Sequence, residues 1–184
     1  MRKKDGFSFQ KIKRDNKGHI ILEYSQIIEG KTAEHISKFD EEPAPEFSAA
    51  FGRLGKIACH MLELDADLAA RFTPRTVAYS FDGDDRLQAI IICEYHMPNS
   101  GATVMVETPL YKAPLDEKEA ARPGYFSQSA VQALWDLAHE ASRYLKGHRA
   151  QMSLFDDEAE PAPRTESPRA LPSSGVVAQI SAAM

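Results

Sequence analysis

The chain has 184 residues, and 43% of them are hydrophobic, which is enough for one folded domain of ordinary size with a tail. No apolar run reaches the roughly 18–20 residues that a bilayer-spanning helix needs, and no apolar segment of the secretory kind follows the basic start "MRKKDG". These features argue against a membrane partner and predict a cytoplasmic protein. The net charge of −5 is uneven, because residues 1–40 hold nine Lys or Arg against six Asp or Glu.

The first forty residues have the pattern of a β-meander. Residues 6–15 alternate apolar and polar side chains, a turn rich in Asn and Gly follows at 15–18, and residues 19–27 form the returning strand of a hairpin. A third, weaker strand is predicted at 31–39, after the turn at Glu29 and Gly30.

A helix is predicted to begin near Glu46, because Pro43 and Pro45 prevent a regular element before it. Its apolar residues recur at intervals of three and four, on one helical face: Phe47, Phe51, Leu54, Ala58 and Met61. Two glycines, Gly52 and Gly55, each weaken the helix by up to about 1 kcal/mol and are consistent with close packing on a sheet. A short extra turn at 65–72 is predicted to end at Pro74.

The second half repeats this order. Residues 75–97 predict a strand, a turn at 82–85 and another strand, and residues 99–110 predict a third strand. A polar connection at 111–124 then leads to a long helix at 127–147, with Gly147 just past its end. The apolar stripe of this helix consists of Val131, Leu134, Ala138, Ala141 and Leu145.

Short likenesses support a repeat of two units. "FSF" at 7–9 recurs as "YSF" at 79–81, and "LEY" at 22–24 recurs as "CEY" at 93–95, with offsets of 72 and 71 residues. The predicted fold is therefore α+β, with two β-β-β-α units whose antiparallel sheet is packed by two long helices. Residues 1–150 are predicted to form this domain, and residues 151–184 a separate peptide and tail.

No set of residues predicts an active site. The carboxylates of "DGDD" at 82–85 lack the spacing of a calcium loop and are better explained as a turn. Glu23 and Glu94 occupy matching places in the repeat and could do acid–base work, although both are expected to face solvent. Cys59 and Cys93 have no metal-ligand spacing and predict reduced core thiols. We therefore predict a non-enzymatic protein without a catalytic residue, cofactor or metal, and an enzyme acting on a small substrate is a hypothesis without a residue set.

The segment "QMSLF", residues 151–155, joins the second long helix to the tail. Residues 156–184 are rich in Pro, Ser, Ala and acidic residues and poor in aromatic ones, so they are predicted to be disordered. Two large apolar residues, Leu154 and Phe155, are costly at such a place unless something covers them. Either they pack back on the domain, or a partner binds them.

This segment resembles the peptide by which bacterial proteins dock on the DNA polymerase sliding clamp, whose usual form is Gln, an aliphatic residue, Ser or Asp, Leu and Phe. The matching residues are Gln151, Ser153, Leu154 and Phe155. Met152 replaces the usual Leu with an unbranched apolar side chain of similar volume. The resemblance implies that Leu154 and Phe155 enter an apolar pocket on the clamp. Met152 would then fill a shallower groove, and the Gln151 amide would form hydrogen bonds at the rim.

Most of residues 6–155 also resembles small phage and prophage proteins of unsettled function. The shared landmarks are "GFSF" near the start, "LEY" in the second strand, "TP" after the sixth strand and "EASRYLKGHRAQMSLF" at the end. The resemblance brings no activity with it, but it implies a phage gene expressed in a bacterial cytoplasm. Together with the peptide, it predicts an accessory protein that affects DNA replication or repair at the clamp.

A second hypothesis is a module that binds single-stranded nucleic acid. Its candidate residues are Lys11, Lys13 and Arg14, which are interleaved with Phe7 and Phe9. Neutralising the phosphate backbone while stacking bases on aromatic rings is the usual way to bind single strands. The alternative is a solvated edge strand whose lysines prevent aggregation.

Overall fold

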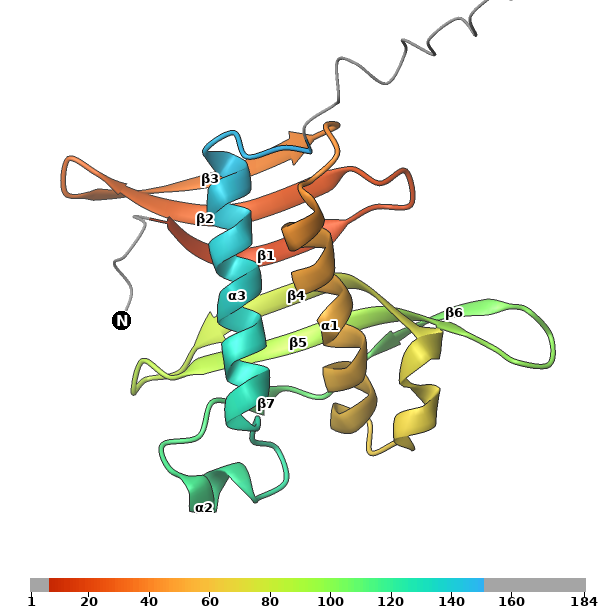
Figure 1. The fold of residues 1–184 in the computed structure, drawn as a ribbon. Coiled ribbons are helices and arrows are strands. Elements are labelled where there is room, and N and C mark those ends of the chain that lie inside the picture. Colours follow the sequence, from red (N-terminus) through yellow and green to blue (C-terminus); the bar gives the residue numbers. More distant parts are fainter. Residues whose placement is uncertain (1–6, 151–184) are drawn as a thin grey trace, which may run out of the picture. The chain divides into compact units, whose positions relative to one another are not determined.

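The computed structural model describes residues 7–150, which fold as an α+β domain (Figure 1). One sheet has the strand order β3-β2-β1-β4-β5-β6 with every neighbouring pair antiparallel, and a short seventh strand also pairs with β5. The strands are β1 (Phe7–Arg14), β2 (Ile20–Ile28), β3 (Lys31–Phe39), β4 (Phe72–Phe81), β5 (Leu87–His96), β6 (Thr103–Glu107) and β7 (Tyr111–Lys112). The helices are α1 (Pro45–Met61), the 3-10 helix η1 (Ala66–Arg71), α2 (Glu117–Ala120) and α3 (Gln128–Leu145). The predicted fold class is confirmed, whereas the predicted disorder of the tail concerns residues outside the described range.

The two predicted units meet at the centre of the sheet. β1, β2, β3 and α1 form the first unit, β4, β5, β6 and α3 form the second, and the antiparallel pair β1–β4 joins them. The strand order therefore reads the same outward from the centre in both directions. Figure 1 shows α1 and α3 side by side on one face of the sheet, both running across the strands.

The structural repeat has a different offset from the likenesses in the sequence. Asp15 accepts hydrogen bonds from the main-chain amides two and four residues further on, and Asp82, 67 positions later, accepts the same two bonds. The same offset of 67 matches buried Ile12 with Tyr79 and buried Ile20 with Leu87. The offsets of 72 and 71 are therefore wrong by about five residues, because alternation of aromatic and polar residues is common to many strands.

The core lies between the helices and the covered face of the sheet. From α1, Phe47 and Phe51 stack with ring centroids 6.2 Å apart, and Phe47 also contacts Tyr144 of α3. The Tyr79 hydroxyl of β4 donates a hydrogen bond of 3.2 Å to the Leu134 carbonyl in α3, so the buried phenol has a partner. No helix within residues 7–150 covers the opposite face, which is called the open face below.

Two local predictions were wrong. Pro74 does not end the turn before β4 but lies within the strand, where a bulge follows it between Pro74 and Thr76. Pro74 lacks an N–H, and it is tolerated there because β1 pairs with β4 only along Thr76–Ala78. The connection at 111–124 contains β7 and α2, because Tyr111 is buried against Phe126 with ring centroids 5.6 Å apart.

The two glycines of α1 give a matched test of its packing on the sheet. A Cβ built on Gly55 would lie 2.7 Å from the Phe72 carbonyl oxygen, whereas a Cβ on Gly52 would meet nothing within 4 Å. We expect Gly52→Ala to stabilise the protein by up to about 1 kcal/mol through helix propensity. Gly55→Ala should destabilise it by about 1–3 kcal/mol, because main chain must move. Urea unfolding measures both, and a stabilising Gly55→Ala would contradict the close approach.

Candidate functional site

The candidate clamp-binding residues Gln151, Met152, Ser153, Leu154 and Phe155 lie outside the residues that the structure describes. Their N-terminal junction, Arg149 and Ala150, is described. α3 ends at Leu145 with Gly147 at φ 96°, the left-handed conformation that glycine adopts readily, and the chain then turns toward the segment between β3 and α1. This junction is the last part of the chain that the structure describes before the candidate peptide.

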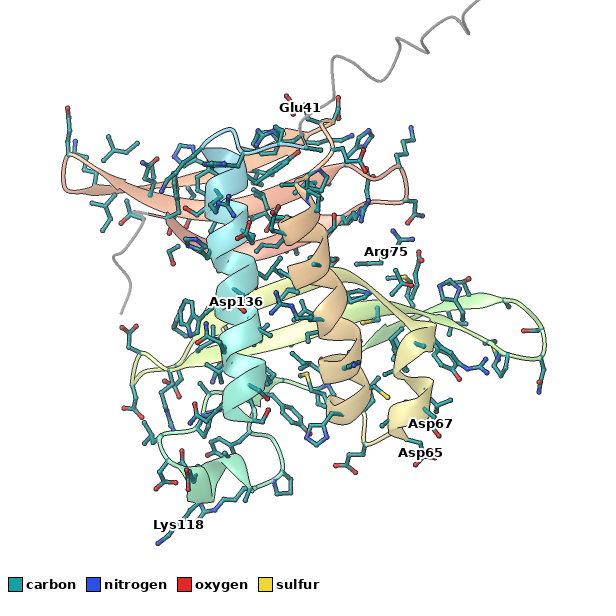
Figure 2. The ribbon with its side chains drawn as sticks, in the orientation of Figure 1. Glu41, Asp65, Asp67, Arg75, Lys118 and Asp136 are labelled. Atoms are coloured by element: carbon teal, nitrogen blue, oxygen red, sulfur yellow. The ribbon has the colours of Figure 1, made fainter. Side chains whose placement is uncertain are left out.

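Arg149 holds the junction in place. Its guanidinium lies 3.7 Å from the ring centroid of Tyr144 and 5.0 Å from that of Phe39, and its Nε lies 3.7 Å from a carboxylate oxygen of Glu41. The Ala150 amide donates a 3.1 Å hydrogen bond to the carbonyl of residue 42, and the Tyr144 hydroxyl donates a 2.6 Å bond to the Glu41 carbonyl. Figure 2 shows Glu41 at the end of the sheet where α3 ends. The segment 148–150 is therefore fixed on the domain up to the first residue of the candidate peptide.

The candidate nucleic-acid residues lie on a central strand. β1 is flanked by β2 and β4, so the interpretation of this segment as an edge strand is wrong. Lys11 and Lys13 project from the open face, and Lys11 Nζ forms a 3.1 Å ion pair with Glu23 Oε1. Arg14, the next residue along, alternates toward the other face and is partly buried. The three residues therefore do not form one basic surface.

The aromatic residues proposed to stack on bases lie on the opposite side of the sheet. Phe9 is buried, and Phe7, Phe9 and Tyr24 form a cluster in which Phe7 and Tyr24 meet edge to face at 5.4 Å. A single strand cannot contact the Lys11 and Lys13 side chains and these rings at the same time. The basic side chains and the aromatic rings that the single-strand hypothesis requires on one surface therefore lie on opposite faces of the sheet.

This arrangement predicts weak or no binding of single-stranded DNA. We expect any binding to be non-specific and to weaken steeply with salt, because released counterions would supply its free energy. Fluorescence anisotropy with a labelled oligonucleotide at low salt measures it, and the Lys11→Glu, Lys13→Glu, Arg14→Glu triple variant is the comparison. Tight binding by the parent chain that this triple variant abolishes would contradict the prediction and restore the hypothesis.

The acidic candidates are engaged in ion pairs and turns. Glu94 forms a 2.6 Å ion pair with Arg75, which Figure 2 labels on β4, and Glu23 is occupied by Lys11, so the two carboxylates do not act together. The "DGDD" segment is a turn, and the pKa of Asp82 lies below its usual value, chiefly because the Arg86 amide donates a hydrogen bond to its carboxylate. Within residues 7–150, no group of three or more His, Cys, Asp or Glu residues is arranged to hold a metal ion.

The two thiols are buried and free, as predicted. Burial raises the pKa of the Cys93 thiol to about 12, and burial, aided by the nearby Asp65 carboxylate, also raises the pKa of Cys59. The Cys59 thiol lies 3.2 Å from the Asp65 carbonyl oxygen, to which it can donate a hydrogen bond. Both residues are therefore protonated near neutral pH and act as packing groups rather than nucleophiles.

Sequence reasoning missed a groove of about 420 Å³ between α1 and the start of α3. Its walls are mostly apolar and include Met61, Tyr111 and Phe126, while Arg53, Lys56 and His60 line it from α1. Arg53 also forms a 3.2 Å ion pair with Asp136, the residue labelled on α3 in Figure 2. The only signal in the sequence was the aromatic character of Tyr111 and Phe126, because α1 lies fifty or more positions before the other lining residues.

Comparisons with known proteins identify no relative. No protein-family model, no curated protein sequence and no solved protein structure matches the chain. Among the helices of residues 7–150, none is both long and apolar enough to cross a membrane. The proposals below therefore depend on the residues of this chain.

Proposed function

We propose that the protein is a non-enzymatic accessory protein of phage type that docks on the bacterial DNA polymerase sliding clamp through residues 151–155, in the cytoplasm of a bacterial host. The observation that carries the proposal is the peptide "QMSLF", which resembles the clamp-docking peptide at four of its five positions. Docking of this kind would place the domain where DNA is replicated or repaired.

The described residues just before the peptide support this proposal, because they are held on the domain. Arg149 and Ala150 are bonded to the segment 41–43, so the chain is attached to the domain up to residue 150. A peptide that begins at a fixed point can reach a partner without unfolding its own domain.

The chemistry of the peptide fits binding by a few buried anchors. Leu154 and Phe155 would each contribute about 1.5–3 kcal/mol by burial in an apolar pocket. Short motifs commonly depend on such anchors, while the flanking contacts add little. The acidic residues that follow, Asp156 and Asp157, limit the apolar run to a few residues, which reduces the risk of aggregation.

The direct test is binding of the full chain to a purified bacterial sliding clamp. We expect a dissociation constant on the order of micromolar, which corresponds to about −8 kcal/mol, as befits five residues with two anchors. Isothermal titration calorimetry measures it, and a synthetic peptide covering residues 148–158 should compete with the full chain for the same site. Absence of binding at tens of micromolar would refute the proposal.

A further inference from the structure

The edge of the sheet formed by β3 is open. β3 has nine residues and pairs only with β2 among the strands of residues 7–150. Its Ile36 side chain is 77% exposed on the open face. A long edge strand with an exposed isoleucine is a template for pairing with another strand, and folded proteins normally protect such an edge.

The turn before β3 determines which main-chain groups point outward. Ile28 and Lys31 close a two-residue turn in which Glu29 and Gly30 have positive φ angles of 51° and 77°. Residues that close such a turn form a hydrogen-bonded pair, and hydrogen-bonded pairs then alternate along an antiparallel ladder without bulges. It follows that the even-numbered residues of β3, from 32 to 38, direct their amides and carbonyls away from β2.

One self-pairing register uses these groups and matches the charges of the edge. If two copies of β3 pair antiparallel about a two-fold axis at Ile36, each Ile36 lies opposite its copy. Each Glu34 then lies opposite a Lys38 of the second copy, on the same open face. The result is an apolar centre flanked by two pairs of opposite charge. Moving the axis by one residue in either direction places Glu34 opposite Ile36 or Asp40 instead.

The residues of this register are available for a partner. Glu34 forms no ion pair within residues 7–150, and Lys38 Nζ has only a distant contact of 4.0 Å with Asp15. On the covered face, the Nε2 atom of His35 is buried and has no hydrogen-bond partner in the described part of the chain. The same register brings Ser37 of the second copy opposite His35, and its hydroxyl can both donate and accept.

From these observations we infer that the protein forms a homodimer through antiparallel pairing of β3 with β3, with the two-fold axis at Ile36. The two seven-stranded sheets then continue into one another, and no free β3 edge remains. This inference does not depend on the proposed clamp binding. In a dimer, however, two copies of the candidate peptide would belong to one particle.

A charge exchange tests both the dimer and its register. Analytical ultracentrifugation of the full chain should show a mass twice the 20.4 kDa of one chain. Glu34→Lys and Lys38→Glu should each weaken the dimer by about tenfold or more, because each change occurs twice and places like charges opposite one another. The double variant Glu34→Lys with Lys38→Glu should restore the dimer to within a few-fold of the parent.

Two further variants complete the experiment. Lys118→Glu makes the same change of charge as Lys38→Glu on α2, at the end of the domain away from β3 (Figure 2), and should leave the dimer intact. Ile36→Lys places two ammonium groups at the axis and should give folded monomers, whose melting temperature no longer depends on protein concentration. A parent chain that stays monomeric at about 100 µM overturns the inference, since a complex weaker than this is marginal. A dimer that the exchanged pair does not restore overturns it as well.

Discussion

Replacing Leu154 and Phe155 together with alanine should remove measurable binding to the sliding clamp. By the area that each side chain would bury, the loss is about 3–6 kcal/mol, so a micromolar complex would weaken by a factor of about 100 or more. The melting temperature should stay nearly unchanged, because these residues follow the anchored junction at Arg149 and Ala150. Calorimetric titration and a thermal melt of the same preparation measure both quantities.

The matched control replaces Asp156 and Asp157 with alanine. This variant also changes two consecutive residues of the same segment, but it leaves the proposed anchors in place, so clamp affinity should change by only a few-fold. A loss of several degrees in the melting temperature of the Leu154→Ala, Phe155→Ala variant would mean that these side chains pack on their own domain. Such a result would contradict docking and support the intramolecular alternative.

Replacing Phe51 with alanine should have the largest effect on stability. Phe51 is buried beneath α1 and stacked on Phe47, so the variant would lose about 3–5 kcal/mol of the free energy of unfolding. Urea unfolding measures the loss through the midpoint at constant slope. Lys56→Ala, on the exposed side of the same helix, should change stability by less than about 0.5 kcal/mol. A loss below about 1 kcal/mol for Phe51→Ala would place α1 outside the core.

The elements that could be predicted from the sequence are those whose signals are local. The helical stripe from Phe47 to Met61 lies on α1, and the glycine at 147 lies just past the end of α3, because periodicity and capping depend on neighbouring residues. The turns at Asp15 and Asp82 were predictable for the same reason. These local elements, taken in order, were sufficient to predict the two-unit α+β architecture.

Features that depend on distant contacts were missed. The pairing of β1 with β4 brings Lys11 beside Ala78, and no local pattern indicates it, so β1 was open to interpretation as an edge strand. Pro74 appeared to precede a strand that in fact contains it, and it is tolerated there because β1 does not extend that far along β4. The candidate docking peptide could be recognised in the sequence because its five residues are consecutive. The groove at Tyr111 and Phe126 could not be predicted, because its lining comes from separate segments.

The two halves of the sheet are joined by a short ladder. β1 and β4 are paired over three residue pairs, whereas the hairpins β1–β2 and β4–β5 are paired over seven and nine. The main-chain bonds of such a short ladder resist separation less than those of either hairpin. The two halves are therefore held together chiefly by α1, which packs on β4 and β5 of the other half, and by α3, which packs on α1. The two helices therefore stabilise the sheet at the point where its main-chain pairing is short.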